Sequence, residues 1–124
     1  MESLNLPKTQ YTLGVDLNSE TGILEMIGAS YPENALEFFQ PIFSWLESYT
    51  SDIKNVVHFN FKVDYLNTSS TKCIMEILEI LEEYGGKGGD VDINWFFEKD
   101  DEDILEIGED LTDDIEVPIN FVPY

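Results

Sequence analysis

Basic residues and cysteine are scarce in this sequence. Its 124 residues include six Lys or Arg against 26 Asp or Glu, which gives a formal net charge of −20. Such a charge repels nucleic acid, which binds basic surfaces, and it also repels anionic membrane surfaces. The composition therefore argues against a nucleic-acid-binding protein and favours a protein partner with a complementary basic patch.

Long apolar runs and a secretion signal are also missing. Cys73 is the single cysteine, so no internal disulfide can form, which fits a reducing compartment. The N-terminal residues lack the basic and apolar segments of a signal peptide. No apolar stretch approaches the roughly 20 residues that span a bilayer. We expect a soluble, cytoplasmic protein that does not insert into a membrane.

The length and the apolar content indicate one domain over residues 1–124. A chain of 124 residues suits one compact domain and is too short for two ordinary ones. Hydrophobic residues make up 43% of the chain and aromatic residues 13%, which is enough for a core. No linker, internal repeat or low-complexity segment divides the sequence.

The first half of the chain shows strand patterns followed by a helical one. Residues 11–17 and 21–28 indicate two short strands in a hairpin, because Asn18 and Gly22 between them suit a turn. Apolar residues then recur at helical spacing from Asn34 onward. Pro41 lies inside this pattern, so we expect either a kink there or a helix that starts nearer residue 40.

The second half alternates strands with helices. Apolar residues alternate with polar ones over 55–66, the best strand candidate, and helical spacing follows until the glycine-rich residues 85–89. A strand over 91–98, a short acidic helix over 100–111 and a last strand over 117–124 complete the chain. The order ββαβαβαβ predicts an α/β fold with a mixed five-stranded sheet and about three helices.

Two segments resemble ligand loops without meeting their requirements. The glycine-rich residues 85–89 contain Lys87, but glycine follows it where a phosphate loop needs Ser or Thr, and the segment ends a helix. Asp90, Asp92 and Asn94 begin like a calcium loop, but Trp95 stands where the turn glycine is needed. We predict a solvated acidic strand here.

The residues that usually carry catalysis are few. His58 is the only histidine and has no histidine or cysteine partner at zinc-ligand spacing. Cys73 lies one turn into a helix among apolar residues, as expected of a buried small side chain. We therefore predict no catalytic residue, no metal site and no cofactor.

Residues 65–70, Tyr-Leu-Asn-Thr-Ser-Ser, lie where a strand turns into a helix. Asn67, Thr68 or Ser69 can each cap the helix by accepting hydrogen bonds from backbone N–H groups. Capping explains one or two of these residues and does not require the whole run. Because a helix N-terminus also tolerates a phosphate well, a second hypothesis is that one hydroxyl is a phosphorylation switch.

This motif and the element order resemble those of a known family. Tyr65–Ser70, together with Ser-Tyr-Pro-Glu-Asn at residues 30–34, resembles the SiaC family of bacterial biofilm-regulating phosphoproteins over nearly the whole chain. The architecture is also similar to the STAS fold of anti-sigma-factor antagonists, which are phosphorylated at a comparable turn. We therefore expect a STAS-like domain.

The resemblance implies a partner-switching adaptor that is not an enzyme. In the family a protein kinase phosphorylates the motif threonine, here Thr68, and a PP2C-type phosphatase removes the phosphate. The unphosphorylated form binds and activates a diguanylate cyclase, which raises cyclic di-GMP and regulates biofilm formation. Ser69 and Ser70 are the nearest competing acceptors, and Tyr65, Leu66 and Asn67 complete the switch motif. The first alternative is a constitutive protein-binding module in which the motif only caps a helix, and the second is an enzyme with a carboxylate site that no spacing in the sequence singles out.

The helix that begins at the switch offers a candidate contact surface. Met75 lies off the apolar stripe of this helix, and an exposed methionine suits an adaptable contact. We hypothesise that Met75, with Lys72 and Glu76, joins the partner footprint. We also expect the loop at residues 30–34 to lie near the motif at 65–70, because both connect a strand to a helix.

Overall fold

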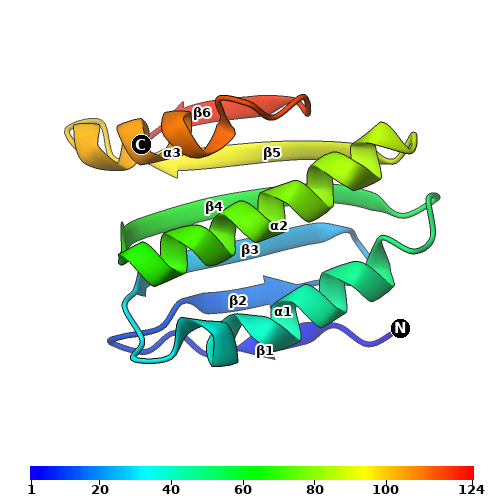
Figure 1. Cartoon of the computed structure of the whole chain (residues 1–124), viewed down its shortest axis with the longest axis horizontal. Coiled ribbons are helices and arrows are strands. Elements are labelled where there is room, and N and C mark those ends of the chain that lie inside the picture. Colours follow the sequence, from blue (N-terminus) through cyan, green and yellow to red (C-terminus); the bar gives the residue numbers. More distant parts are fainter.

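The computed structural model describes all 124 residues as a six-stranded sheet that carries three helices on one face (Figure 1). The strands lie side by side in sequence order, and their bounds are β1 Leu4–Leu6, β2 Gly14–Leu17, β3 Ile23–Ser30, β4 Val56–Leu66, β5 Asp90–Phe97 and β6 Ile119–Pro123. Pairing is antiparallel from β1 to β3 and parallel from β3 to β6. The sheet is therefore mixed, as predicted.

The helices connect the parallel strands. They are α1 Ala35–Tyr49, α2 Thr68–Gly86 and α3 Glu102–Thr112, and each joins two neighbouring parallel strands. Connections of one hand place all three helices on the same face, where α1 covers the antiparallel side, α2 the middle and α3 the β5–β6 side (Figure 1). No helix is long and apolar enough to cross a membrane.

The predicted five-stranded sheet was wrong by one strand. The edge strand β1 spans only three residues, too few to show an alternating pattern, and it forms by pairing with β2. The observed order is therefore βββαβαβαβ. The other predicted elements, including the hairpin of β2 and β3 and the edge strand β6, are confirmed.

Helix α1 begins at Ala35, six residues before Pro41. This start decides against one of the two alternatives predicted for the helix around Pro41. Asn34 caps the helix by accepting a hydrogen bond from the Glu37 N–H, and the helix runs through Pro41. Pro41 offers no N–H to the Glu37 carbonyl, but both residues are exposed, so water can reach that carbonyl. A start nearer residue 40 is therefore wrong.

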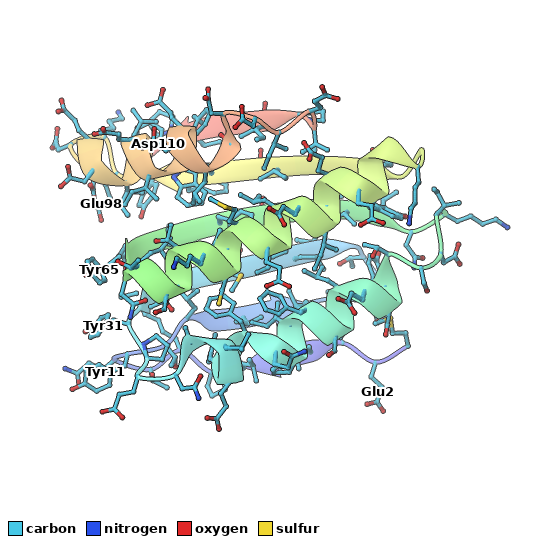
Figure 2. All side chains as sticks on the ribbon, viewed as in Figure 1. Glu2, Tyr11, Tyr31, Tyr65, Glu98 and Asp110 are labelled. Atoms are coloured by element: carbon cyan, nitrogen blue, oxygen red, sulfur yellow. The ribbon has the colours of Figure 1, made fainter.

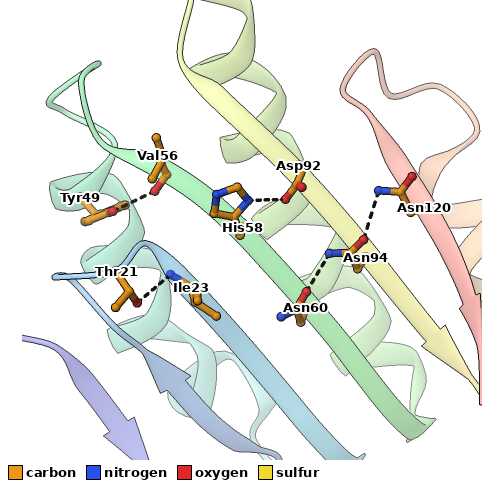
Figure 3. A network of polar contacts seen from close by, with 9 residues as sticks. All are labelled: Thr21, Ile23, Tyr49, Val56, His58, Asn60, Asp92, Asn94 and Asn120. Carbon is orange, nitrogen blue, oxygen red and sulfur yellow. Dashed lines mark hydrogen bonds and ion pairs between the residues drawn. The ribbon is translucent and has the colours of Figure 1, made fainter.

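The two faces of the sheet differ in polarity because helices cover only one. Val57, Phe59, Phe61 and Val63 of β4 point into a single core cluster of 28 buried residues. The opposite face carries the polar residues of the same strands. There His58 Nδ1 lies 2.8 Å from Asp92 Oδ1, and amide side chains form a ladder from Asn60 through Asn94 to Asn120 at 2.9 and 3.1 Å (Figure 3).

Candidate functional site

The loop at residues 30–34 and the motif at 65–70 lie side by side at the carboxyl edge of the sheet. Strands β3 and β4 are parallel and end together, with Ser30 paired to Leu66. The Asn67 N–H donates to the Ser30 carbonyl at 2.9 Å, and Ser30 Oγ lies 2.7 Å from Ser70 Oγ. The expected proximity of the two segments is confirmed.

A β-bulge directs the side chains at the end of β4. Val63 pairs with Gly28 and Tyr65 pairs with Ala29, so Asp64 is the extra residue. The bulge ends the alternation that buries every second residue up to Val63, and it leaves Tyr65 53% exposed. Leu66 takes the next inward position instead. Opposite the bulge, Gly28 has φ +103°, a conformation that favours glycine.

Asn67 and Ser70 have structural roles in the motif. Asn67 is the N-cap of α2, and its Oδ1 accepts a hydrogen bond from the Ser70 N–H at 2.8 Å. The Ser70 side chain is fully buried against Ser30, and its hydroxyl is engaged there. Ser70 is thus inaccessible to an enzyme in the folded protein, which leaves two hydroxyls at the start of α2.

Thr68 and Ser69 are exposed at the first two positions of α2. Their N–H groups precede the first backbone bond of the helix, which the Thr71 N–H donates to the Asn67 carbonyl at 2.9 Å. These N–H groups and the positive end of the helix favour an anion at this place. The arrangement can present a hydroxyl to an enzyme and accommodate a phosphate once it is attached.

Two of the three predicted contact residues line a groove beside this helix start. A groove of about 360 Å³ separates the starts of α1 and α2, and Ser69, Lys72 and Glu76 line it together with Leu36 and others. Met75 is 43% exposed and lies outside the groove. Lys72, Met75 and Glu76 therefore share an accessible surface with Thr68 without forming one pocket.

Cys73, on the core side of this surface, is buried as predicted. Burial raises the pKa of its thiol, and the nearby carboxylate of Glu76 raises it further. A raised thiol pKa disfavours the reactive thiolate. Cys73 therefore acts as a small core residue.

Two tyrosines next to the motif were not predicted as part of the site. Tyr31 packs edge to face on Tyr65 with ring centroids 5.6 Å apart, and Tyr11 packs in the same way on Tyr31 at 5.2 Å (Figure 2). Tyr31 belongs to the loop at residues 30–34, so a prediction that the two strands are parallel could have placed Tyr31 near Tyr65. The sequence around Tyr11 carries no pattern that predicts its contact with Tyr31.

The fold has close counterparts among known proteins. Residues 6–124 match the family described as SiaC family regulatory phosphoprotein. The chain belongs to this SiaC family. An uncharacterized protein of Pseudomonas aeruginosa (strain UCBPP-PA14) is 35% identical over 118 residues, which cover 95% of this chain and 94% of that relative.

Solved SiaC structures share the whole fold. SiaC of Pseudomonas aeruginosa is 32% identical, covers 100% of both chains and superposes with a TM-score of 0.94. A SiaC chain from the crystal structure of the diguanylate cyclase SiaD in complex with its activator SiaC, also from Pseudomonas aeruginosa, is 33% identical, with 98% and 99% coverage and a TM-score of 0.94. The SiaC family likeness thus includes the sheet edge that carries both motifs.

Proposed function

We propose that residues 1–124 act as a non-enzymatic signalling adaptor whose unphosphorylated form binds and activates a diguanylate cyclase, and that phosphorylation of Thr68 ends this interaction. The regulatory phosphoprotein family and the solved complex of a 33% identical SiaC with a diguanylate cyclase support this proposal. The observation that carries it is the division of roles in the motif, where Asn67 caps the helix, Ser70 is buried, and Thr68 stays exposed with no structural bond.

The proposed switch acts locally. Phosphorylation adds about −1.5 to −2 charges, which changes little in a chain of net charge −20. At Thr68, however, the phosphate would take the free N–H groups at the start of α2, so a partner could no longer use them. A partner covering this turn would also have to desolvate a dianion. A loss of about 2.7 kcal/mol already weakens binding roughly a hundredfold.

The switch requires two enzymes and a target. We propose a protein kinase and a PP2C-type phosphatase that act on Thr68, and a diguanylate cyclase that reads the unphosphorylated surface, including Lys72, Met75 and Glu76. The output is cyclic di-GMP and, through it, biofilm formation. Kinases and cyclases consume nucleoside triphosphates, so we place this exchange in the cytoplasm.

Phosphosite mapping tests the acceptor. The folded protein is incubated with a cognate kinase and ATP, digested and analysed by mass spectrometry. Phosphate on Thr68, and its removal by the phosphatase, is the expected result. Ser69 is the matched control because it is the exposed neighbour. Phosphate on Ser69 with none on Thr68 would refute the assignment.

Binding and cyclase activation test the switch itself. Thr68→Ala should bind and activate a cognate diguanylate cyclase like the parent but resist the kinase, whereas phosphorylated parent and Thr68→Asp should lose activation. Ser69→Ala should behave like the parent in every assay. The constitutive module predicts equal binding by all five proteins. Because Asn67 is the N-cap, loss of a cap cannot account for an effect at Thr68.

Met75→Glu tests the contact surface. Met75 is exposed and is not one of the buried core residues, so the variant should fold like the parent and bind the cyclase more weakly. Equal binding by the two proteins would remove Met75 from the footprint.

A further inference from the structure

Three exposed tyrosines form a continuous row beside the switch motif. Tyr11, Tyr31 and Tyr65 are 53%, 38% and 53% exposed, and consecutive rings meet edge to face at 5.2 and 5.6 Å (Figure 2). We call Tyr11, Tyr31 and Tyr65 the tyrosine row. Edge-to-face packing stabilises such a pair by only about 0.5–1.5 kcal/mol, and all three side chains remain exposed. Folding alone gives little reason to expose three aromatic rings together.

Backbone hydrogen bonds hold the tyrosine row in place. The Tyr31 N–H donates to the Tyr11 carbonyl at 2.9 Å, and the Asn67 N–H donates to the Ser30 carbonyl at 2.9 Å. The bulge at Asp64 turns Tyr65 outward where plain alternation would bury it. The row is therefore pre-organised, and rigid aromatic residues are the side chains that contribute most at protein interfaces.

Exposed carboxylates flank the tyrosine row in the sequence. Glu33 follows Tyr31 in the same loop and is exposed, and Asp64 precedes Tyr65 and is exposed. Asp64 also lies close enough to Tyr124, with Glu98 and Asp101, to help burial raise the pKa of the Tyr124 hydroxyl. Glu98 lies at the same end of the molecule as the row (Figure 2). A guanidinium group binds well to aromatic faces and to carboxylates, and this end of the molecule offers both.

A cation–π contact within the chain shows this chemistry at the same edge of the sheet. The Lys62 Nζ lies 4.4 Å from the centroid of the Tyr124 ring. The chain thus already places a cation over a tyrosine at the carboxyl edge of the sheet. No base of the chain lies over the rings of the tyrosine row.

We propose that the tyrosine row binds an arginine-bearing segment of the protein partner, with guanidinium groups stacked on the ring faces and paired to the flanking carboxylates. Charge complementarity selects this occupant, because the chain carries 26 acids against six bases. Arginine fits better than lysine, since its planar, weakly hydrated guanidinium stacks on aromatic faces and binds carboxylates in a bidentate way.

The row deepens the proposed function and rests on it for the identity of the partner. Tyr65 and Thr68 belong to one motif, so a phosphate on Thr68 would stand beside the row. Phosphorylation would add a dianion that a segment docked on the row must desolvate, so the modification that ends cyclase binding would also weaken docking on the row.

Binding by full-length variants tests the row. The triple variant Tyr11→Ser, Tyr31→Ser, Tyr65→Ser removes the rings, the corresponding Phe triple variant keeps them, and Tyr65→Ser alone guards against misfolding of the triple variant. Ile53→Ser is the matched control, since Ile53 is 46% exposed outside the row. The probes are two peptides of equal length and charge, one with arginine and one with lysine, and the cognate diguanylate cyclase.

The parent should prefer the arginine peptide at about 0.15 M salt, where long-range attraction is screened. The Ser triple variant should bind it about tenfold more weakly and lose the preference over lysine. Tyr65→Ser should show a smaller loss, and the Phe triple variant and Ile53→Ser should match the parent. Equal binding of both peptides by the parent, or unchanged binding by the Ser triple variant, would overturn the proposal.

The cyclase arm separates this proposal from the switch. If activation of the cognate cyclase depends on the Thr68 state while the Ser triple variant activates like the parent, the switch stands and the row is refuted. If the parent fails to activate the cognate cyclase but prefers the arginine peptide through its tyrosines, the row stands and the proposed cyclase function fails.

Discussion

The buried pair Ser30 and Ser70 supports a quantitative prediction about the two motifs. Their hydroxyls lie 2.7 Å apart and both side chains are fully buried, so each is the other's hydrogen-bond partner. Ser70→Ala leaves the Ser30 hydroxyl buried with that partner gone, which costs about 1–3 kcal/mol of unfolding free energy. Replacing both residues by Ala removes both polar groups, and the double variant should recover much of this loss.

Urea unfolding of the four proteins measures this coupling. With a slope of about 2 kcal/mol per molar urea, the middle of the usual range, the single variants should shift the midpoint downward by about 0.5–1.5 M. Ser69→Ala is the control, because Ser69 is exposed, and it should change stability by less than about 0.5 kcal/mol. If the double variant lost the sum of the two single losses, the hydroxyls would not be coupled and the described contact would be wrong.

Three further predictions concern the same edge of the sheet. Asn67→Ala removes the N-cap of α2 and should cost about 1 kcal/mol in urea unfolding, whereas Thr68→Ala should cost less than about 0.5 kcal/mol; the reverse order would contradict the cap assignment. Gly28→Ala forces a side chain into φ +103° and should cost about 1–3 kcal/mol by the same assay, so an unchanged midpoint would argue against the bulge geometry. Burial and Glu76 raise the pKa of the Cys73 thiol, so this thiol should react with a disulfide reagent far more slowly in the folded protein than in urea. In the folded protein the reaction rate should also rise only at a higher pH than for a free thiol. Equal rates in the folded protein and in urea would contradict the burial of Cys73.

Local patterns in the sequence were enough to predict most elements. The alternation of Val57, Phe59, Phe61 and Val63 and the apolar stripe of α2 each repeat over several turns or residue pairs, and the structure buries them as predicted. Strand β1 escaped prediction because three residues carry too little pattern, and it exists through its pairing with β2.

The sequence by itself determined where the strand ends, where α2 begins and which family the motifs resemble, because these features depend on neighbouring residues. It could not assign roles within the motif. Ser70 is buried by a contact with Ser30, 40 residues away in the chain, and Tyr65 is turned outward by a bulge opposite Gly28. Only the pairing of β3 with β4 brings these groups together, so the tertiary structure alone decided which hydroxyls of the run stay exposed.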